Sequence, residues 1–374
     1  MFHYQYHVID TSLPKGLYGQ TALADIDRDG RPEYIVGLQY GDIYYYKYRS
    51  PEKWDRYLLG KDSPSDVGAA VLDVDGDGWS DFVAGGAWYK NPGREGAPFE
   101  KIVFDPGLRG VHDLFAADVD GDGKQEIVTM SDQNDLRWYK IPGDARGRWK
   151  PTRIGPAVHA GAAAGDLTGS GSMDIVRTNV WFENAAGDGT KWVEHPLPFP
   201  AQNKELLTQP FMVDATIASV CDMDGDGRND IVMAESEMTG GKLFWLQNVR
   251  GDGSEWARRD IAVPRRPFRG AYHSLWVGDM DRDGDLDVVS CEMEDIRGEN
   301  PPRYYVWENL DGKGMRWKEH VILDVNLGGH AAVVGDVTGS GWPDLISKPW
   351  APYAGNALGG KPFVLFLENL GGTE

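Results

Sequence analysis

A short acidic pattern that could bind a metal ion occurs seven times along the chain. Each copy has Asp at position 1, Asp or Thr at position 3, Asp or Ser at position 5, Gly at position 6 and an acid at position 9. Carboxylates at alternate positions of a tight turn present the oxygen ligands that Ca²⁺ prefers, and Gly permits the sharp bend. We therefore expect structural calcium in these loops. Position 1 is Asp25, Asp73, Asp118, Asp166, Asp222, Asp279 and Asp336.

Five of the seven copies carry a complete set of carboxylates. These sets are Asp25, Asp27, Asp29 and Glu33; Asp73, Asp75, Asp77 and Asp81; Asp118, Asp120, Asp122 and Glu126; Asp222, Asp224, Asp226 and Asp230; and Asp279, Asp281, Asp283 and Asp287. The fourth and seventh copies keep only Asp166 with Asp174 and Asp336 with Asp344, so binding there should be weaker or absent. Hydrogen-bonded turns without metal are the alternative for every copy.

Four of the eight histidines stand at equivalent places in the repeat. His112, His273 and His330 lie six residues before the first Asp of a copy, and His159 lies seven before it. Imidazole groups can act as general base and acid near neutral pH, or bind a Zn²⁺-like ion. The sequence leaves both roles open, together with a structural role at strand ends.

The repeat itself predicts the fold. Successive copies are separated by 45 to 57 residues, which suits a propeller blade of four short strands. In the third repeat we expect strands at residues 112–118, 126–131, 136–141 and 149–154. The predicted fold class is all-β, a seven-bladed β-propeller of four-stranded antiparallel blades.

The whole chain, residues 1–374, is predicted to form this single propeller. The expected blades are residues 16–60, 62–106, 109–157, 158–200, 211–264, 268–325 and 328–374. The last blade lacks an outer strand, and the segment around His7 matches the outer-strand pattern around His320. Residues 1–10 should therefore supply that strand and close the ring, which removes the exposed sheet edges.

This geometry predicts where a functional site would lie. If the acidic loops follow the innermost strands at one face, those strands begin around the central channel at the opposite face. The four histidines should meet there. Further catalytic candidates on that face are Tyr272, Arg109, Arg269 and Lys348, and the substrate-binding candidates are Trp350, Glu292, Glu294 and Asn356.

Composition excludes several partners. The formal net charge of -20 disfavours nucleic acid and anionic membranes, and no apolar run is long enough to span a bilayer. Cys221 and Cys291 fall in apolar runs and are expected to be buried thiols. Without a recognisable signal peptide we expect a cytoplasmic protein, or a secreted or periplasmic one if the N-terminus has been trimmed. The oligomeric state is left open.

The repeated Asp-x-Asp-x-Asp-Gly motif followed by an apolar strand resembles the FG-GAP or VCBS repeat family over essentially the whole chain. The segments Trp-Tyr-Lys-Asn-Pro-Gly at residues 88–93 and Ser-Lys-Pro-Trp at residues 347–350 resemble the propeller domain of aldos-2-ulose dehydratases and related carbohydrate lyases. This resemblance implies a carbohydrate partner and elimination chemistry.

Two functions follow as hypotheses. In the first, the protein is a carbon–oxygen lyase acting on a keto-sugar or a uronic-acid-containing saccharide. His273 or His112 would be the base and Tyr272 or His159 the acid; Arg109, Arg269 or Lys348 would stabilise the enolate or carboxylate. In the second, it is a non-catalytic lectin-like or adhesion propeller, since fold does not fix function.

Overall fold

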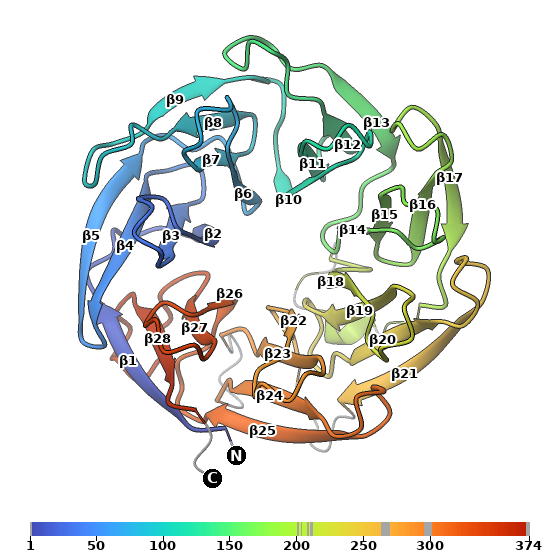
Figure 1. Ribbon diagram of the computed structural model, residues 1–374. Coiled ribbons are helices and arrows are strands. Elements are labelled where there is room, and N and C mark those ends of the chain that lie inside the picture. Colours follow the sequence, from blue (N-terminus) through green and yellow to red (C-terminus); the bar gives the residue numbers. More distant parts are fainter. Residues whose placement is uncertain are drawn as a thin grey trace.

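The strands form a closed ring of seven sheets around a central opening (Figure 1). A computed structural model describes residues 2–199, 202, 204–207, 209, 212–262, 270–294 and 301–371. Within these residues every sheet has four antiparallel strands, which confirms the predicted all-β seven-bladed propeller. No helix in the described part of the chain is long and apolar enough to cross a membrane.

Each blade runs from the channel outwards through strands A, B, C and D. Blades 1 to 3 contain β2 (Tyr18–Ala24), β3 (Glu33–Leu38), β4 (Ile43–Ser50) and β5 (Lys53–Gly60); β6 (Ala69–Leu72), β7 (Asp81–Ala84), β8 (Ala87–Lys90) and β9 (Glu100–Val103); and β10 (Val111–Ala117), β11 (Glu126–Ser131), β12 (Leu136–Tyr139) and β13 (Pro151–Gly155). Blades 4 and 5 contain β14 (Ala163–Gly165), β15 (Asp174–Arg177), β16 (Val180–Asn184) and β17 (Trp192–Pro196), then the short 3₁₀ turn η1 (Lys204–Leu206), and β18 (Thr216–Cys221), β19 (Asp230–Glu235), β20 (Leu243–Asn248) and β21 (Trp256–Ala262). Blades 6 and 7 contain β22 (Trp276–Gly278), β23 (Asp287–Cys291), β24 (Tyr304–Asn309) and β25 (Trp317–Leu323); and β26 (His330–Gly335), β27 (Asp344–Lys348), β28 (Val364–Asn369) and β1 (Tyr4–Asp10).

The N-terminal strand closes the ring, as predicted. β1 pairs antiparallel with β28, with Tyr4 opposite Asn369 and Val8 opposite Leu365. The first and last described segments consequently lie together at blade 7, where the N–H of Leu370 donates to the carbonyl of His3 at 2.9 Å (Figure 1).

The outer strand of the third blade begins later than predicted. It starts at Pro151, because Trp149 turns inward instead of continuing the strand. The Trp149 ring stacks on Phe104 at 4.0 Å, and its indole N–H donates to the carbonyl of Ala145 at 3.0 Å. Trp88 of blade 2 donates to the same carbonyl at 3.1 Å, so one backbone oxygen links two neighbouring blades.

Both cysteines are unbridged, as expected. Cys291 is fully buried, whereas Cys221 is only half-buried. Burial raises the pKa of both thiols to about 12, so neither is present as a reactive thiolate at neutral pH.

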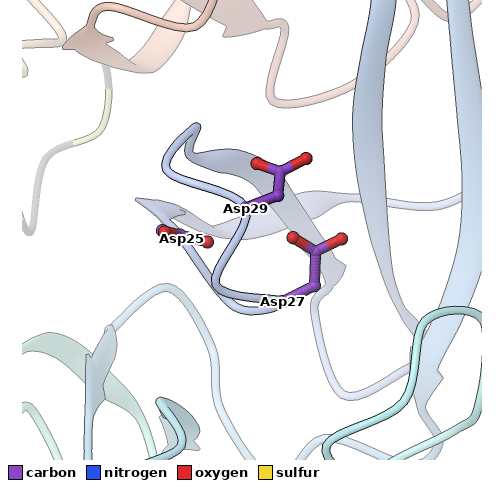
Figure 2. A group of neighbouring side chains, drawn as sticks. All are labelled: Asp25, Asp27 and Asp29. Atoms are coloured by element: carbon purple, nitrogen blue, oxygen red, sulfur yellow. The ribbon is translucent and has the colours of Figure 1, made fainter.

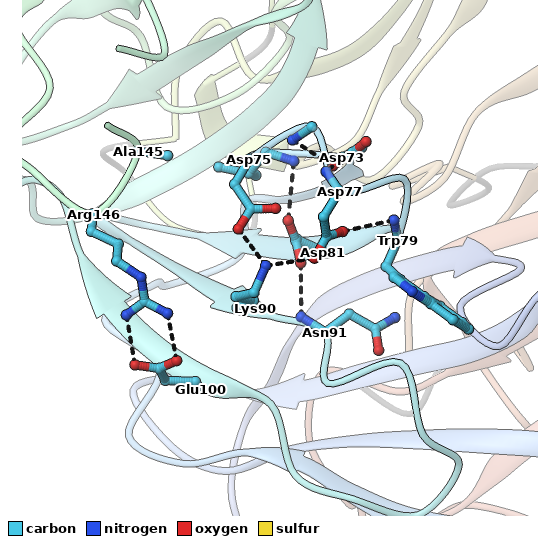
Figure 3. Close-up of polar contacts among 12 residues, drawn as sticks. Asp73, Asp75, Asp77, Trp79, Asp81, Lys90, Asn91, Glu100, Ala145 and Arg146 are labelled. Carbon is cyan, nitrogen blue, oxygen red and sulfur yellow. Dashed lines mark hydrogen bonds and ion pairs between the residues drawn. The ribbon is translucent and has the colours of Figure 1, made fainter. Parts of the chain in front are cut away.

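The acid at position 9 of every loop accepts hydrogen bonds from backbone N–H groups. Each of these seven carboxylates accepts a hydrogen bond from the N–H of the residue at position 2 of its own loop. In five blades it also accepts the N–H of an Asn on strand C, and Figure 3 shows this contact between Asp81 and Asn91. The position-9 acids therefore hold the loop to strand C in addition to any part in metal binding.

Replacing Asp174 by Ala tests these hydrogen bonds in a loop that has few carboxylates for a metal. The change leaves two buried N–H groups, those of Leu167 and Asn184, without a hydrogen-bond acceptor. The free energy of unfolding should therefore fall by about 2–5 kcal/mol. Urea denaturation followed by tryptophan fluorescence, with EDTA present, measures the loss. Asp188→Ala at an exposed turn is the control, and equal stability of the two variants would contradict the assignment.

Candidate functional site

A cavity of about 490 Å³ lies at the central channel, where the innermost strands begin. His112, His159 and His330 line it together with Val67, which holds the equivalent place in blade 2. The other lining residues that matter below are Asp66, Asp132, Glu237, Glu294, Trp350 and Tyr353. The cavity is therefore built from residues of several blades at the predicted place.

The four inner histidines meet at this cavity in two pairs. The rings of His112 and His159 lie 4.4 Å apart between centroids, and those of His273 and His330 stack at 3.7 Å. Trp350 packs 5.0 Å from the His330 ring. His273 is not among the lining residues and lies behind His330 and Glu237, which do line the cavity. Strand geometry thus predicted the meeting of the imidazoles, but not their division into two pairs.

Carboxylates orient three of the four rings. His159 Nδ1 lies 3.0 Å from Asp132 Oδ2, and His273 Nε2 lies 2.8 Å from Glu237 Oε1. His112 Nδ1 is 3.5 Å from the carboxylate of its neighbour Asp113. Such contacts fix the direction of an imidazole ring.

His330 is buried and His112 is largely buried, but their environments move their pKa values in opposite directions. Burial alone would lower the pKa of His112, yet the Asp113 carboxylate raises it above the ordinary value. Burial, and then the charges of His273 and Lys348, hold the pKa of His330 well below the ordinary value. His330 is therefore a neutral imidazole, and both of its ring nitrogens are buried without a partner among the described residues.

The two basic candidates within the described residues bind backbone instead of facing the cavity. Lys348 is fully buried, and its ammonium donates to the carbonyls of Tyr18 and Gly19 across the seam between blades 7 and 1. Burial, opposed by the charge of Glu294, lowers the pKa of Lys348 to about 7. Arg109 donates to the carbonyl of Leu108. Arg269 lies outside the described residues.

Three other candidates have structural contacts and do not line the cavity. Tyr272 is fully buried and packs edge-on against Trp307 at 5.6 Å. Glu292 accepts the N–H groups of Gly270 and Arg303, both at 3.1 Å. Asn356 bonds to backbone groups of the turn that it begins, at residues 356–361. Sequence position brought these residues to the correct face, but their side chains turn into the protein.

Glu294 and Trp350 do line the cavity, and they are connected. Glu294 Oε1 accepts the N–H groups of Trp350 at 2.7 Å and of Ala351 at 3.1 Å. Its Oε2 is buried without a hydrogen-bond partner in the described part of the chain. Sequence analysis did not single out Asp66, Asp132 or Tyr353. Asp132 directly follows strand β11. Its place at the end of a strand B is the sequence feature that could have identified it as a candidate.

Five acidic loops bring three potential ligand oxygens within 4.8 Å of one another, and Figure 2 shows that of blade 1. They are the loops of blades 1, 2, 3, 5 and 6; among the described residues the loops of blades 4 and 7 form no such group. Buried oxygens without a hydrogen-bond partner in the described structure remain in four of these loops, on Asp25, Asp27, Asp118, Asp120, Asp224 and Asp281. An all-carboxylate donor set with unsatisfied buried oxygens fits Ca²⁺.

Lysines on strand C neutralise part of this charge in three blades. Lys47 pairs with Asp27 and Asp29, Lys90 with Asp75 and Asp77 (Figure 3), and Lys140 with Asp120 and Asp122. The equivalent residue is Gln247 in blade 5 and Glu308 in blade 6. Sequence analysis did not identify this position, although it immediately precedes the strand C Asn in several blades.

The fold and the loops together define a seven-bladed propeller with acidic A–B turns. The chain belongs to the FG-GAP-like repeat family, whose model matches residues 25–84, 118–176 and 222–290, about half of the chain. No curated protein sequence matches it significantly.

Solved structures resemble the chain in fold. One is an Agrocybe aegerita lectin that specifically recognises non-reducing terminal N-acetylglucosamine, with 17% identity, a TM-score of 0.56 and coverage of 94% of this chain and 100% of the lectin. Another is BBS1N in complex with ARL6DN, with 11% identity, a TM-score of 0.57 and coverage of 98% of this chain and 96% of that chain. The WD40 propeller domain of Doa1 has 12% identity, a TM-score of 0.51 and coverage of 97% of both chains. Identities this low establish the shared fold alone.

Replacing Lys348 by Met tests whether burial lowers the pKa of this lysine. The unfolded chain keeps this proton up to about pH 10. The folded protein releases it near pH 7, so the unfolded state binds more protons above pH 7 and Lys348 makes stability rise with pH. Urea unfolding between about pH 7.5 and 9.5, below tyrosine ionisation, should show this rise in the wild type and a weaker one in Lys348→Met. Exposed Lys361→Met is the control, and identical slopes in all three proteins would contradict the assignment.

Proposed function

We propose that the protein is a carbon–oxygen lyase that carries out β-elimination on a keto-sugar or a uronic-acid-containing saccharide. The reaction takes place in the cavity at the central channel described above, here called the mouth cavity. The supporting observation is that His112 and His330 share one cavity while their pKa values are shifted in opposite directions. Titratable groups separated in this way are suited to divide acid and base roles.

Each histidine has a distinct role in this proposal. Neutral His330 accepts the proton on the carbon beside the carbonyl, and the electron pair of that C–H bond moves to form an enolate. Protonated His112 donates a hydrogen bond to the enolate oxygen as its charge develops. His159, oriented by Asp132, gives its proton to the departing oxygen as the β C–O bond breaks. His273 transfers no proton to or from the substrate in this scheme, because its Nε2–H donates to Glu237.

A carbohydrate ligand is supported by the aromatic side of the cavity. Trp350 lines the cavity beside His330 and offers a ring face on which a sugar can pack. The Agrocybe aegerita lectin of similar fold recognises a sugar, which makes sugar binding by this architecture physically reasonable. Binding without chemistry, as in a lectin, is the competing function.

Replacing His330 by Gln is the direct test of the elimination. Elimination beside a carbonyl creates a conjugated double bond, so wild-type protein should produce ultraviolet absorbance with a keto-sugar or a uronide. Loss of the base should slow the reaction by about 10²–10⁴-fold. His195→Gln is the matched control, because His195 lies on an outer strand and bonds to Glu183. Absorbance that forms equally fast in both variants would remove His330 as the base. Sugar binding without absorbance would favour the lectin-like function.

We also propose Ca²⁺ in the A–B loops, with a structural role, and tighter binding where no lysine enters the loop. The pKa of Asp285 in blade 6 is raised to about 6 by burial and by the charges of Asp283 and Asp281, which indicates uncompensated negative charge. In blade 2, Lys90 already offsets such charge. The support for a cation is therefore strongest in blade 6.

The loops of blades 2 and 6 provide a matched comparison for this calcium proposal. Calcium binding to the folded state raises the melting temperature, and Asp281→Asn should reduce that rise more than Asp75→Asn does. Scanning calorimetry with Ca²⁺ or EDTA, together with elemental analysis of the dialysed protein, measures both effects. A melting temperature unaffected by Ca²⁺ in the wild type would contradict structural calcium.

A further inference from the structure

The mouth cavity is lined by acids and by no described lysine or arginine. Asp66, Asp132, Glu237 and Glu294 all contribute to its wall. The basic candidates within the described residues, Arg109 and Lys348, donate to backbone carbonyls and are not lining residues. A ligand carboxylate would therefore meet no lysine or arginine among the described lining residues.

Some of this negative charge is not offset by the histidines. Asp132 and Glu237 are each bonded to an imidazole. Asp66 instead accepts a hydrogen bond from the neutral side-chain amide of Gln39, which leaves its charge in place. The net charge of -20 on the whole chain adds to the negative potential at a concave site.

Aromatic side chains complete a wall suited to a cation. Trp350 and Tyr353 both line the cavity, and Trp350 is held in place by Glu294 through backbone N–H groups. An ammonium group over an aromatic face is attracted by the negative face of the ring, in addition to its attraction to carboxylates. Carboxylates beside aromatic rings, without a lysine or arginine among the described lining residues, match an amine-bearing ligand.

We propose that the cavity takes a saccharide that carries a free amino group and rejects uronates. This inference rests on the proposed carbohydrate site and selects among its substrates by charge. The ammonium group lies near Asp66, and the sugar ring packs on Trp350. A uronate is excluded because its carboxylate would be desolvated beside like charges.

Calorimetric binding of small sugars tests the inference without requiring turnover. Glucosamine, glucose, N-acetylglucosamine and glucuronate are titrated into the calcium-containing protein near neutral pH and low salt. Glucosamine should bind about tenfold more tightly than glucose or N-acetylglucosamine, and glucuronate should bind least. Added salt should weaken the binding of glucosamine and leave that of glucose unchanged.

Asp66→Asn provides the residue-level test. This nearly isosteric change should weaken glucosamine binding about five- to tenfold and leave glucose binding unchanged, and Asp252→Asn at an exposed turn is the control. Equal affinities for glucosamine and glucose, tighter binding of glucuronate, or no glucosamine binding would each overturn the inference. If glucosamine is preferred but no sugar gives ultraviolet absorbance, the inference stands and the lyase proposal fails. If a neutral keto-sugar undergoes elimination but amino sugars are not preferred, the lyase proposal stands and this inference fails.

Discussion

A buried carboxylate at the ninth position of each acidic loop is the contact on which the propeller depends. It accepts the N–H of its own loop, and in five blades it also accepts the N–H of a strand C Asn. In blades 2, 4 and 5 the side chain of that Asn also reaches the preceding blade, as when Asn91 donates to the carbonyl of Ile26 at 2.8 Å. Loop, sheet and neighbouring blade are thus held by one charged group, and its burial raises the pKa of Asp81 to about 7. The same carboxylates that suggest metal binding have a structural role without a metal.

This contact also determines where chemistry can occur. Fixing the end of every strand A at one face fixes its beginning at the channel on the other face. His112, His159 and His330 are consequently brought to one cavity by strands from three blades. Their surroundings then make them chemically different: Asp113 raises the pKa of His112 against the effect of burial, whereas burial and the charges of His273 and Lys348 lower the pKa of His330. A repeated backbone carries an asymmetric site, which is what a reaction with separate acid and base roles requires.

The sequence predicts the features that follow from repetition. The spacing of the acidic pattern predicts seven blades, the outer-strand pattern around His7 predicts ring closure, and the position of the histidines predicts their meeting at the channel. Side-chain direction in the irregular segments beyond the strands is not predicted. Lys348 and Tyr272 occupy suitable positions in the chain, but one bonds to carbonyls across a blade seam and the other packs in the core. The lysines of strand C were missed because their partners are fixed by sheet pairing and lie 13 to 20 residues away in sequence.

A crystal structure of the protein soaked with a saccharide would test the central claim most directly. The account predicts one sugar in the channel-mouth cavity, with its ring against Trp350 and a hydroxyl or carbonyl oxygen within hydrogen-bond distance of His330 or His112. Sugar bound between blades at the periphery, with the cavity still filled by solvent, would contradict it.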